Sequence, residues 1–314
     1  MSRAGQPTGA VLRTIVIVGS GVVGTATGKG LQAKGHRVVF CDVVPERVAL
    51  LRAEGFTAIH ADDLAGPEPE AYFIAVPTPT VDRGVDLSYV GSASEAVGRA
   101  IRSHRGWPLV VVRSTVPPGT TEDTVIPGLE SASGRHAGKD FGVCTNPEFL
   151  RAATAMEDFE NPKVIVIGAL DDRSERALRG VYAPWPDVPV VATSLRTAEA
   201  TKYVANLFNA TKISFFNEMH RVLLAFGADP DVAFQATARA AEGIWNPTYG
   251  TRGGAPYGGV CLPKDTVGLL RFAEAFGIGD LLPILRAVVR TNEEMKAWIE
   301  EAPAPGREAR AISA

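Results

Sequence analysis

The stretch Gly258-Gly259-Val260-Cys261-Leu262-Pro263-Lys264-Asp265 sets a lone thiol between two glycines and a charge pair. The residues that follow, Thr266 to Phe276, have a helical composition, so Cys261 is predicted to lie at a helix start. Unpaired backbone N–H groups there and the nearby ammonium of Lys264 both favour the thiolate. We therefore interpret Cys261 as a covalent nucleophile. The alternative is a turn with a half-buried structural cysteine, since glycine and proline are common in turns.

A second chemical signature lies near the start of the chain, where residues 19–24 read Gly-Ser-Gly-Val-Val-Gly. This G-x-G-x-x-G pattern holds the pyrophosphate of a dinucleotide when it joins a buried strand to a helix. The β-branched run from Thr14 to Val18 predicts the strand, and the stretch up to Lys34 predicts the helix. A second strand then ends at Asp42, which completes the expected order. The alternative is a bare tight turn.

Each position of this signature has a defined task. Gly19 makes the turn, Gly21 lets the pyrophosphate approach the backbone, and Gly24 permits close packing of helix on strand. Asp42 is placed to accept hydrogen bonds from the adenosine ribose, and its charge repels the 2′-phosphate of NADP, so NAD is the predicted cofactor. Arg47 is a further cofactor contact whose charge would tolerate a phosphate. The valines that open the helix complete the predicted pyrophosphate site: Val22 and Val23.

Composition describes an ordinary soluble globular protein of 314 residues, with 46% hydrophobic and 21% charged residues. That length is sufficient for two domains. The net charge of −3 argues against a nucleic-acid partner that needs a strong basic field. Three widely spaced cysteines indicate a reducing compartment rather than a disulfide framework. Five scattered histidines, none at ligand spacing to another, predict no metal site.

No targeting or membrane-spanning segment is expected. No apolar run approaches the length of a membrane span, and the opening Met1 to Thr14 is too polar for a signal peptide. We therefore expect a cytoplasmic protein. Its N-terminal residues, and the Ala- and Pro-containing stretch after about Ala302, are expected to fray.

Alternating strands and helices predict an α/β fold, with a Rossmann-like, doubly wound N-terminal domain. Its further strands are expected at Ala71 to Val76, Leu109 to Arg113, Gly142 to Thr145 and Val164 to Gly168. After about Thr193 the strand signal stops, and helical periodicity predicts an all-helical domain. Its helices are expected at Leu195 to Phe226, Asp231 to Ala241 and, as one long helix, Asp280 to Glu301. The predicted boundaries are 1–194 for the NAD-binding domain, 195–302 for a helical catalytic and dimerisation domain, and 303–314 for a disordered tail.

Loops at the carboxyl ends of parallel strands face the ligand crevice in such sheets. Pro77 and Thr78 follow one predicted strand, Thr115 follows the next, and Glu148 follows a third. We expect Thr115 and Glu148 to reach one pocket, and Pro77, Thr78 and Thr115 to be cofactor contacts. The alternatives are a turn or helix cap for Thr115 and a solvated carboxylate for Glu148.

Lys202 and Asn206 stand four apart on a predicted helix and therefore share one face. An ammonium and a carboxamide placed in this way could hold a developing oxyanion. The alternative is that both are ordinary surface residues.

The motifs together resemble the UDP-glucose/GDP-mannose dehydrogenase family. They occur in the family's order and cover residues from about 14 to 300. The segments that carry the resemblance are Gly19 to Gly24, Ser114 to Thr120, Asn146 to Leu150, Lys202 with Asn206, Lys212-Ile213-Ser214 before Asn217-Glu218, and Gly258 to Asp265.

The resemblance implies NAD-dependent oxidation of a primary alcohol of a sugar or sugar nucleotide to a carboxylate, by two hydride transfers. Cys261 would add to the aldehyde to form a thiohemiacetal, the second hydride transfer would leave a thioester, and water would hydrolyse it. Lys202 and Asn206 would hold the oxyanion, and Asp265 with Thr115 would position the water. Glu148 would act as the acid–base group.

The same resemblance implies further contacts and an oligomeric state. Beside Lys202 and Asn206, the implied substrate contacts are Phe149, Leu150, Tyr257 and Gly258, and Lys264 is an implied cofactor contact. A homodimer built on the long helix is also implied. The apolar stripe of that helix, which is Leu282, Leu285, Val288 and Val289, supports this use, although burial inside the monomer is the competing explanation.

Three features depart from the family. A second glutamate usually stands four places beyond Glu148, where this chain has Ala152, which puts thioester hydrolysis or the second oxidation in doubt. An Asp-Pro-Arg-Ile-Gly-like element before the cysteine is replaced by Ala241 to Pro247, and Arg252 is the nearest substitute for its arginine. Family members also usually continue past the long helix into a domain of at least ~100 residues that grips the nucleotide, and we expect the nucleotide to be held differently or by a partner here.

The shorter length leaves two other functions open. One is a non-catalytic or partner-dependent NAD-binding module, and the other is an alcohol dehydrogenase that stops at the aldehyde. A module without catalysis has no need of a thiol, a lysine, an amide and a carboxylate at four separate motifs, so the two-step enzyme is favoured. The identity of the alcohol does not follow from the sequence.

Overall fold

The computed structural model describes residues 12–66, 68–82 and 84–301. The predicted disordered tail, 303–314, lies outside these residues. The chain divides into two compact units, Met1–Ala205 and Asn206–Ala314, which are called the first and the second unit below.

The first unit contains an eight-stranded sheet with the order β10-β9-β8-β7-β4-β1-β2-β3. The bounds of the strands are β1 Thr14–Val18, β2 Arg37–Asp42, β3 Thr57–His60, β4 Ala71–Ile74, β7 Leu109–Val112, β8 Gly142–Thr145, β9 Ile165–Ala169 and β10 Val190–Thr193. A separate ribbon pairs β5 Thr80–Val81 with β6 Gly84–Val85. Strand order turns back at β1, as in doubly wound sheets, so the predicted Rossmann-like fold is confirmed.

One strand pair departs from a purely parallel sheet. β8 and β9 are antiparallel, with Cys144 opposite Ala169 and Thr145 opposite Gly168. The connection between them holds only two short helices, η3 Ala152–Thr154 and α5 Ala155–Glu160, and does not cross the sheet. β9 therefore starts at the edge where β8 ends, and runs back beside it.

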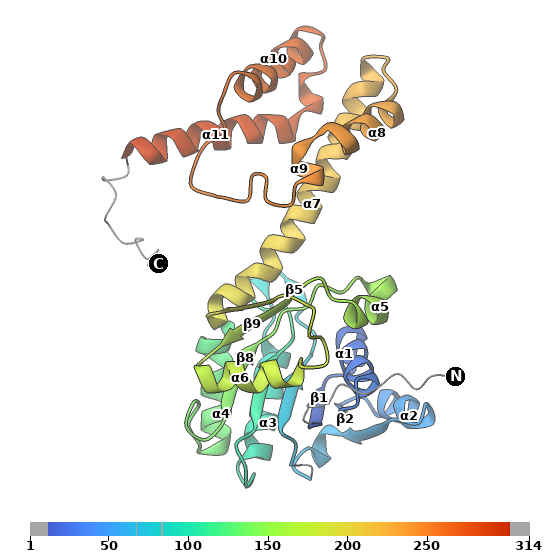
Figure 1. Ribbon diagram of the computed structural model, residues 1–314, viewed down its shortest axis with the longest axis vertical. Coiled ribbons are helices and arrows are strands. Elements are labelled where there is room, and N and C mark those ends of the chain that lie inside the picture. The colour runs from blue at the N-terminus through green and yellow to red at the C-terminus, as the bar shows by residue number, and fades with distance from the viewer. Residues whose placement is uncertain (1–11, 67, 83, 302–314) are drawn as a thin grey trace. The chain divides into compact units, whose positions relative to one another are not determined.

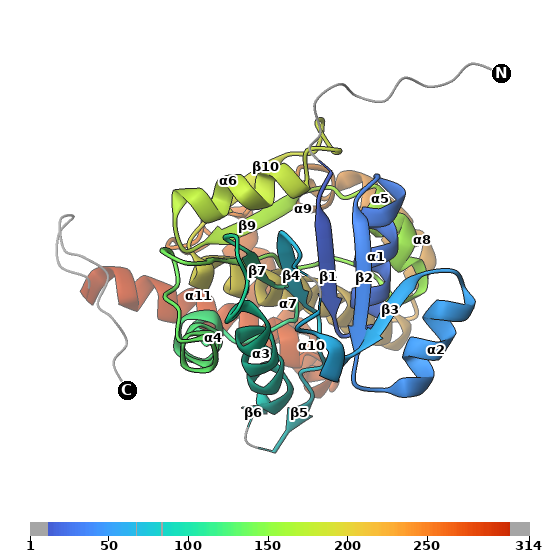
Figure 2. The ribbon, with the colours of Figure 1, turned by 90° about the horizontal axis from the view of Figure 1, so that it is seen from below.

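Helices cover both faces of the sheet (Figure 1, Figure 2). Alternate residues of β1 enter two different cores: Ile15 and Ile17 join one, and Val16 and Val18 join the other. The first core is closed by α1 Val22–Ala33, α2 Pro45–Ala53, α5 and α6 Asp172–Val181. The second is closed mainly by α3 Ser88–Ile101, by the one-turn π-helix η2 Thr121–Val125 and by α4 Ile126–Ser133. A short turn, η1 Ala61–Asp63, follows β3.

The second unit is helical, as predicted. α7 Leu195–Ala225 begins in the first unit and continues into the second, where it is followed by α8 Pro230–Ala240, α9 Glu242–Trp245, α10 Cys261–Ala275, η4 Gly279–Leu281 and α11 Pro283–Glu301. Its core is small and centres on Val222, Ala273 and Leu282. The long helix begins at Pro283 rather than at Asp280, because proline suits the first helical position and residues 279–281 form a separate turn.

A buried carboxylate fixes the start of this long helix. Glu218 on α7 accepts the backbone N–H groups of Ile284 at 2.6 Å and of Leu285 at 3.0 Å. These are donors that a helix start leaves without intrahelical partners. In the described part of the chain, no helix is both long enough and apolar enough to cross a membrane.

Candidate active site

The turn between β1 and α1 is built on two glycines that no larger residue could replace without movement. Gly19 has φ +95°, and a Cβ atom there would lie 2.6 Å from the carbonyl oxygen of Ala75. A Cβ atom on Gly24 would lie 1.9 Å from the carbonyl oxygen of Gly19. A Cβ atom on Gly21 would lie 3.8 Å from a guanidinium nitrogen of Arg47, which is an ordinary contact distance. The backbone at Gly21 is therefore open to a ligand.

Asp42 is buried at the end of β2 and is tied to this turn. Its Oδ2 accepts the backbone N–H of Ser20 at 2.7 Å and the Ser20 hydroxyl at 2.5 Å, and its Oδ1 accepts the N–H of Val44 at 3.0 Å. Burial works to raise the pKa of Asp42, but these hydrogen bonds and the charge of Arg47 outweigh it and hold the pKa below its usual value. Asp42 is therefore a carboxylate. With Arg47 and Pro77 it lines a hollow of about 620 Å³.

A smaller hollow of about 250 Å³ opens at the N-terminus of α1. It brings together residues from four loops that the sequence analysis had named: Gly21, Val22, Val23, Pro77, Thr78, Thr115 and Glu148. The Thr78 hydroxyl donates to the carbonyl oxygen of Thr115 at 2.8 Å and so links two of these loops. Its remaining walls include Arg113 and Ser114.

Glu148 and Lys202 form a buried ion pair. Glu148 Oε1 lies 2.8 Å from Lys202 Nζ, and the two side chains are 8% and 7% exposed. Glu148 Oε2 accepts the backbone N–H of Leu150 at 2.6 Å. The alternatives, a solvated carboxylate for Glu148 and an ordinary surface residue for Lys202, are therefore wrong. Asn206, one turn further along α7, is exposed and belongs to the second unit.

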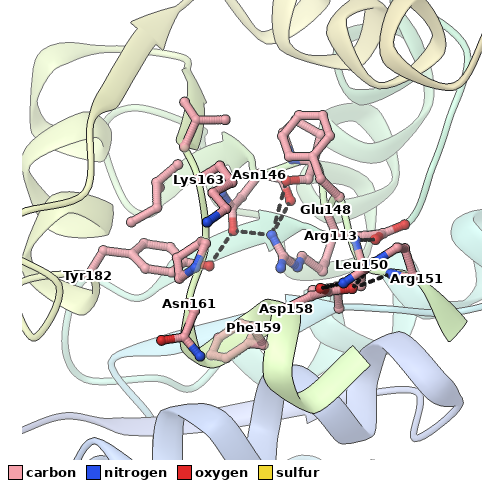
Figure 3. Close-up of a pocket in the computed structure, with 15 residues that line it drawn as sticks. Arg113, Asn146, Glu148, Leu150, Arg151, Asp158, Phe159, Asn161, Lys163 and Tyr182 are labelled. Atoms are coloured by element: carbon pink, nitrogen blue, oxygen red, sulfur yellow. Dashed lines mark hydrogen bonds and ion pairs between the residues drawn. The ribbon is translucent and has the colours of Figure 1, made fainter. Parts of the chain in front are cut away.

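Behind Glu148 lies a hollow of about 420 Å³, lined by Phe149, Leu150 and a buried polar group that the sequence analysis did not identify (Figure 3). Asn146 Oδ1 accepts hydrogen bonds from Arg113 Nη1 at 2.8 Å and from the Tyr182 hydroxyl at 2.5 Å. Burial raises the pKa of Tyr182, so the neutral hydroxyl is the donor. Asn146 lies within a motif, whereas nothing in the sequence around Tyr182 pointed to this role.

Ala152, the residue found where a second glutamate was expected, lines an open groove of about 630 Å³ beside Gly21 and Val22. Its methyl group offers no acid–base function. Glu157 is a carboxylate-bearing residue on the same groove.

The remaining predicted residues lie in the second unit. Cys261 is the first residue of α10 and is exposed, so a half-buried structural cysteine is not what the structure contains. Lys264 and Asp265 form an exposed ion pair, with 2.6 Å between Nζ and Oδ1. The other two cysteines are buried, and burial raises the pKa of Cys41 to about 12 and also raises the pKa of Cys144.

The loop before Cys261 lines a hollow of about 960 Å³ together with α11. Arg252, Tyr257 and Gly258 contribute to its wall. The backbone of Tyr257 is held on both sides by Asn292, whose Oδ1 accepts the Tyr257 N–H at 2.7 Å and whose Nδ2 donates to the Tyr257 carbonyl at 3.2 Å. Asn292 is 5% exposed and was not identified from the sequence.

Comparison with known proteins identifies the family of this chain. Residues 61–186 match the NAD binding domain of the UDP-glucose/GDP-mannose dehydrogenase family, residues 196–294 match its central domain, and residues 15–64 match a TrkA-N domain. GDP-mannose 6-dehydrogenase of Pseudomonas putida is 34% identical, over 89% of this chain and 68% of that protein. UDP-glucose 6-dehydrogenase AglM of Haloferax volcanii is 35% identical, over 88% and 69% respectively.

Solved structures give the same result. A ternary complex of GDP-mannose dehydrogenase from Pseudomonas aeruginosa superposes with a TM-score of 0.82 at 33% identity, covering 90% of this chain and 68% of that one. A UDP-glucose dehydrogenase from Pyrobaculum islandicum gives a TM-score of 0.68 at 38% identity, covering 93% and 70%. This chain therefore belongs to the UDP-glucose/GDP-mannose dehydrogenase family, and its first unit carries the NAD-binding domain of that family.

Proposed function

We propose that this protein is an NAD-dependent dehydrogenase that oxidises a primary alcohol of a nucleotide sugar to a carboxylate by two hydride transfers. The observation that carries the proposal is the buried pair of Glu148 and Lys202, 2.8 Å apart, with Glu148 on the wall of the hollow at the start of α1. A carboxylate and an ammonium held away from water can take up a proton and stabilise a negative oxygen. The names of the relatives support a nucleotide sugar as the substrate class.

The residues present fit NAD, which when bound supplies the acceptor for each hydride. The open backbone at Gly21 suits a pyrophosphate, and the N-terminus of α1 favours its negative charge. Asp42 retains acceptor capacity toward ribose hydroxyls and is ionised, which disfavours a 2′-phosphate. Thr78 and Thr115 line the adjoining smaller hollow.

In the first oxidation the substrate hydroxyl loses its proton and its carbon loses a hydride, which leaves an aldehyde. Glu148 is the proposed proton acceptor, directly or through water. Lys202 Nζ, with the carboxamide of Asn206, would donate to the oxygen that carries the developing negative charge. A buried ammonium is well suited to this task, because the low local dielectric strengthens its interaction with an oxyanion.

In the second oxidation the Cys261 sulfur bonds to the aldehyde carbon, and the oxygen takes a proton. Loss of that proton and of a second hydride leaves a thioester on Cys261. Water, positioned by Asp265 and Thr115, then adds to the thioester carbon, and the thiolate departs as the carboxylate forms. The exposed position of Cys261 at the first residue of α10 supports this role, because its sulfur is accessible to an aldehyde carbon.

Product stoichiometry tests the proposal. The purified protein is incubated with NAD and either GDP-mannose or UDP-glucose, and NADH, aldehyde and acid are quantified together. We expect about two NADH for each substrate consumed, with acid as the product. One NADH with accumulated aldehyde would overturn the two-step reaction in favour of the single-step enzyme, which the methyl group at Ala152 makes the main competitor. NAD binding with turnover only after addition of a second protein would identify a partner-dependent module.

We also propose that the protein is a homodimer that uses α11. Leu282 is buried in the core of the second unit and Leu285 packs against it, so part of the apolar stripe serves the monomer. Val288, Trp298 and Ile299 remain 38%, 60% and 40% exposed, and they are available for a second copy. Light scattering should give twice the monomer mass, and Trp298→Glu should shift it toward the monomer.

A further inference from the structure

We propose that Tyr182 and Arg113 are positioning residues, which hold the Glu148 carboxylate against Lys202 by acting through Asn146. The inference rests on the proposed function, in which Glu148 and Lys202 carry the acid–base and oxyanion roles. Neither Tyr182 nor Arg113 was among the residues to which the sequence assigned a task.

Asn146 is the centre of the arrangement and is 1% exposed. Its side-chain oxygen accepts from both Arg113 and Tyr182, and its side-chain nitrogen donates to the Val166 carbonyl at 2.7 Å. Its backbone N–H donates to the Val112 carbonyl at 2.8 Å. The residue is thereby fixed to β7 and β9, which flank β8 on either side, and to the end of α6, with its amide in a single orientation.

Arg113 extends this grip to the backbone that leads into Glu148. Nη1 donates to the carbonyl oxygens of Asn146 at 3.0 Å and of Pro147 at 3.1 Å, in addition to the Asn146 side chain (Figure 3). In the described part of the chain, Arg113 has no carboxylate partner, although it is 5% exposed. The remaining acceptor of the guanidinium is the Thr27 hydroxyl, 3.4 Å from Nε. A guanidinium with only neutral acceptors orients a loop and does not neutralise an acid.

Glu148 is consequently fixed from both sides. Before it, the carbonyl groups of Asn146 and Pro147 are held by Arg113. After it, the Leu150 N–H and the Lys202 ammonium occupy one carboxylate oxygen each. Loss of the Tyr182 hydrogen bond leaves the Asn146 amide with two of its three side-chain hydrogen bonds. The amide is then less firmly oriented, and the loop that carries Glu148 loses part of its first anchor. The Lys202 ammonium would spend less time paired, although no residue that touches it has changed.

The chain offers a matched control for this idea. Tyr72 on β4 is a second tyrosine buried in the first unit, and its hydroxyl has no hydrogen-bond partner among the residues that the structure describes. Tyr182→Phe and Tyr72→Phe therefore make the same chemical change in the same unit, but only the first removes a hydrogen bond to Asn146. If the activity were lost for structural reasons alone, both variants would lose it, because both residues are buried. If Tyr182 has a positioning role, only Tyr182→Phe loses activity.

The test compares steady-state kinetics of the native protein, both tyrosine variants, Asn146→Ala and the double variant Tyr182→Phe/Asn146→Ala. We expect Tyr182→Phe to lower kcat about three- to tenfold with an unchanged KM for NAD, which corresponds to one modest hydrogen bond. The double variant should be no slower than Asn146→Ala alone, because both changes act through one path. Tyr72→Phe should match the native protein. Equal losses in the two tyrosine variants, or additive losses in the double variant, would overturn the proposal.

A second measurement separates failure of this inference from failure of the proposed function. Acylation of Lys202 by an amine-reactive reagent is followed by mass spectrometry on the whole protein without substrate. Release of the ammonium from Glu148 should speed this labelling severalfold in Tyr182→Phe and leave it unchanged in Tyr72→Phe. The labelling rate tests the positioning role even if the protein oxidises no nucleotide sugar. Unchanged labelling in Tyr182→Phe would overturn the positioning role even in an active enzyme.

Discussion

The two units differ in how far their charged site residues are exposed to solvent. In the first, Glu148 and Lys202 are 8% and 7% exposed and are fixed by further hydrogen bonds. In the second, Lys264 and Asp265 form an ion pair of similar length whose side chains are 67% and 66% exposed, and Cys261 beside them is exposed as well. The first unit has an eight-stranded sheet between two cores, whereas the second has a small core around three fully buried side chains.

This difference teaches which part of the proposed reaction is prepared in advance. The groups of the first unit proposed for the acid–base and oxyanion roles are desolvated and oriented by its own fold, so their geometry does not depend on a ligand. Cys261, the proposed nucleophile in the second unit, has a defined place on a helix but is exposed. Substitution of Glu148 or Lys202 should therefore disturb folding and chemistry together, whereas substitution of Cys261 should disturb chemistry alone.

The largest expected effect belongs to Cys261. Cys261→Ala should lower acid formation by at least about 10³-fold, because no covalent intermediate can form, and should leave the melting temperature and NAD binding unchanged. Acid is measured by chromatography, and NAD binding by fluorescence titration.

Cys144→Ala in the first unit is its counterpart, since that thiol is buried and donates to the Ser174 carbonyl at 3.4 Å. It should lower stability but retain acid formation per folded molecule. If Cys261→Ala still produced acid, the proposed covalent step would be wrong. If Cys144→Ala produced none, the proposed contrast between the two units would be wrong.

The next effect compares two glycines in helices. Gly24→Ala sets a Cβ atom against the Gly19 carbonyl and should destabilise the first unit by more than about 3 kcal/mol. Gly268→Ala on α10 meets no atom within 4 Å and should stabilise the second unit by about 0.5–1 kcal/mol. Urea unfolding followed by circular dichroism checks both. A tolerated Gly24→Ala would show that the turn at β1 and α1 is not closely packed.

A smaller effect separates the two ion pairs. Lys202→Met leaves a buried carboxylate without its cation and should destabilise the protein by about 3 kcal/mol. Lys264→Met breaks an exposed pair and should change stability by less than about 0.5 kcal/mol. The same urea titration measures both. Equal losses of stability in the two variants would mean that burial does not decide how much each ion pair contributes. The contrast drawn between the units would then be wrong for the ion pairs.

The smallest effect is a pH dependence confined to the first unit. Burial is the main cause that lowers the pKa of His36, whose ring contacts the Arg13 N–H and the Val181 carbonyl. Because the folded pKa lies below the unfolded one, the unfolded chain binds more protons as the pH falls. The stability that a neutral His36 provides is therefore present above about pH 6.5 and declines below it, by at most about 1.4 kcal/mol per pH unit.

Thermal unfolding between pH 7.5 and 5.5 measures this slope. His36→Gln should flatten it, whereas His220→Gln, at an exposed position of α7, should keep it. An unchanged slope in His36→Gln would assign the pH dependence to other groups.

Local pattern by itself determined the strand, glycine turn and helix that begin the sheet, the strands β2, β4, β7, β8 and β9, and the placement of Cys261 at a helix start. These features depend on residues that are neighbours in the chain, so periodicity and turn chemistry suffice to predict them. The antiparallel return of β9 was not predicted, because the pattern of buried residues in a strand is the same for either direction.

Only the tertiary structure decided which polar groups are buried and paired. Tyr182 reaches Asn146 across 36 positions of sequence, and Glu148 meets Lys202 across a longer separation still. An isolated glutamate or lysine is expected at the surface, where water solvates its charge, and the sequence gives no reason to place either one inside. Burial becomes tolerable only when folding brings the opposite charge and the hydrogen-bond donors to the same point, and this is a property of the assembled fold.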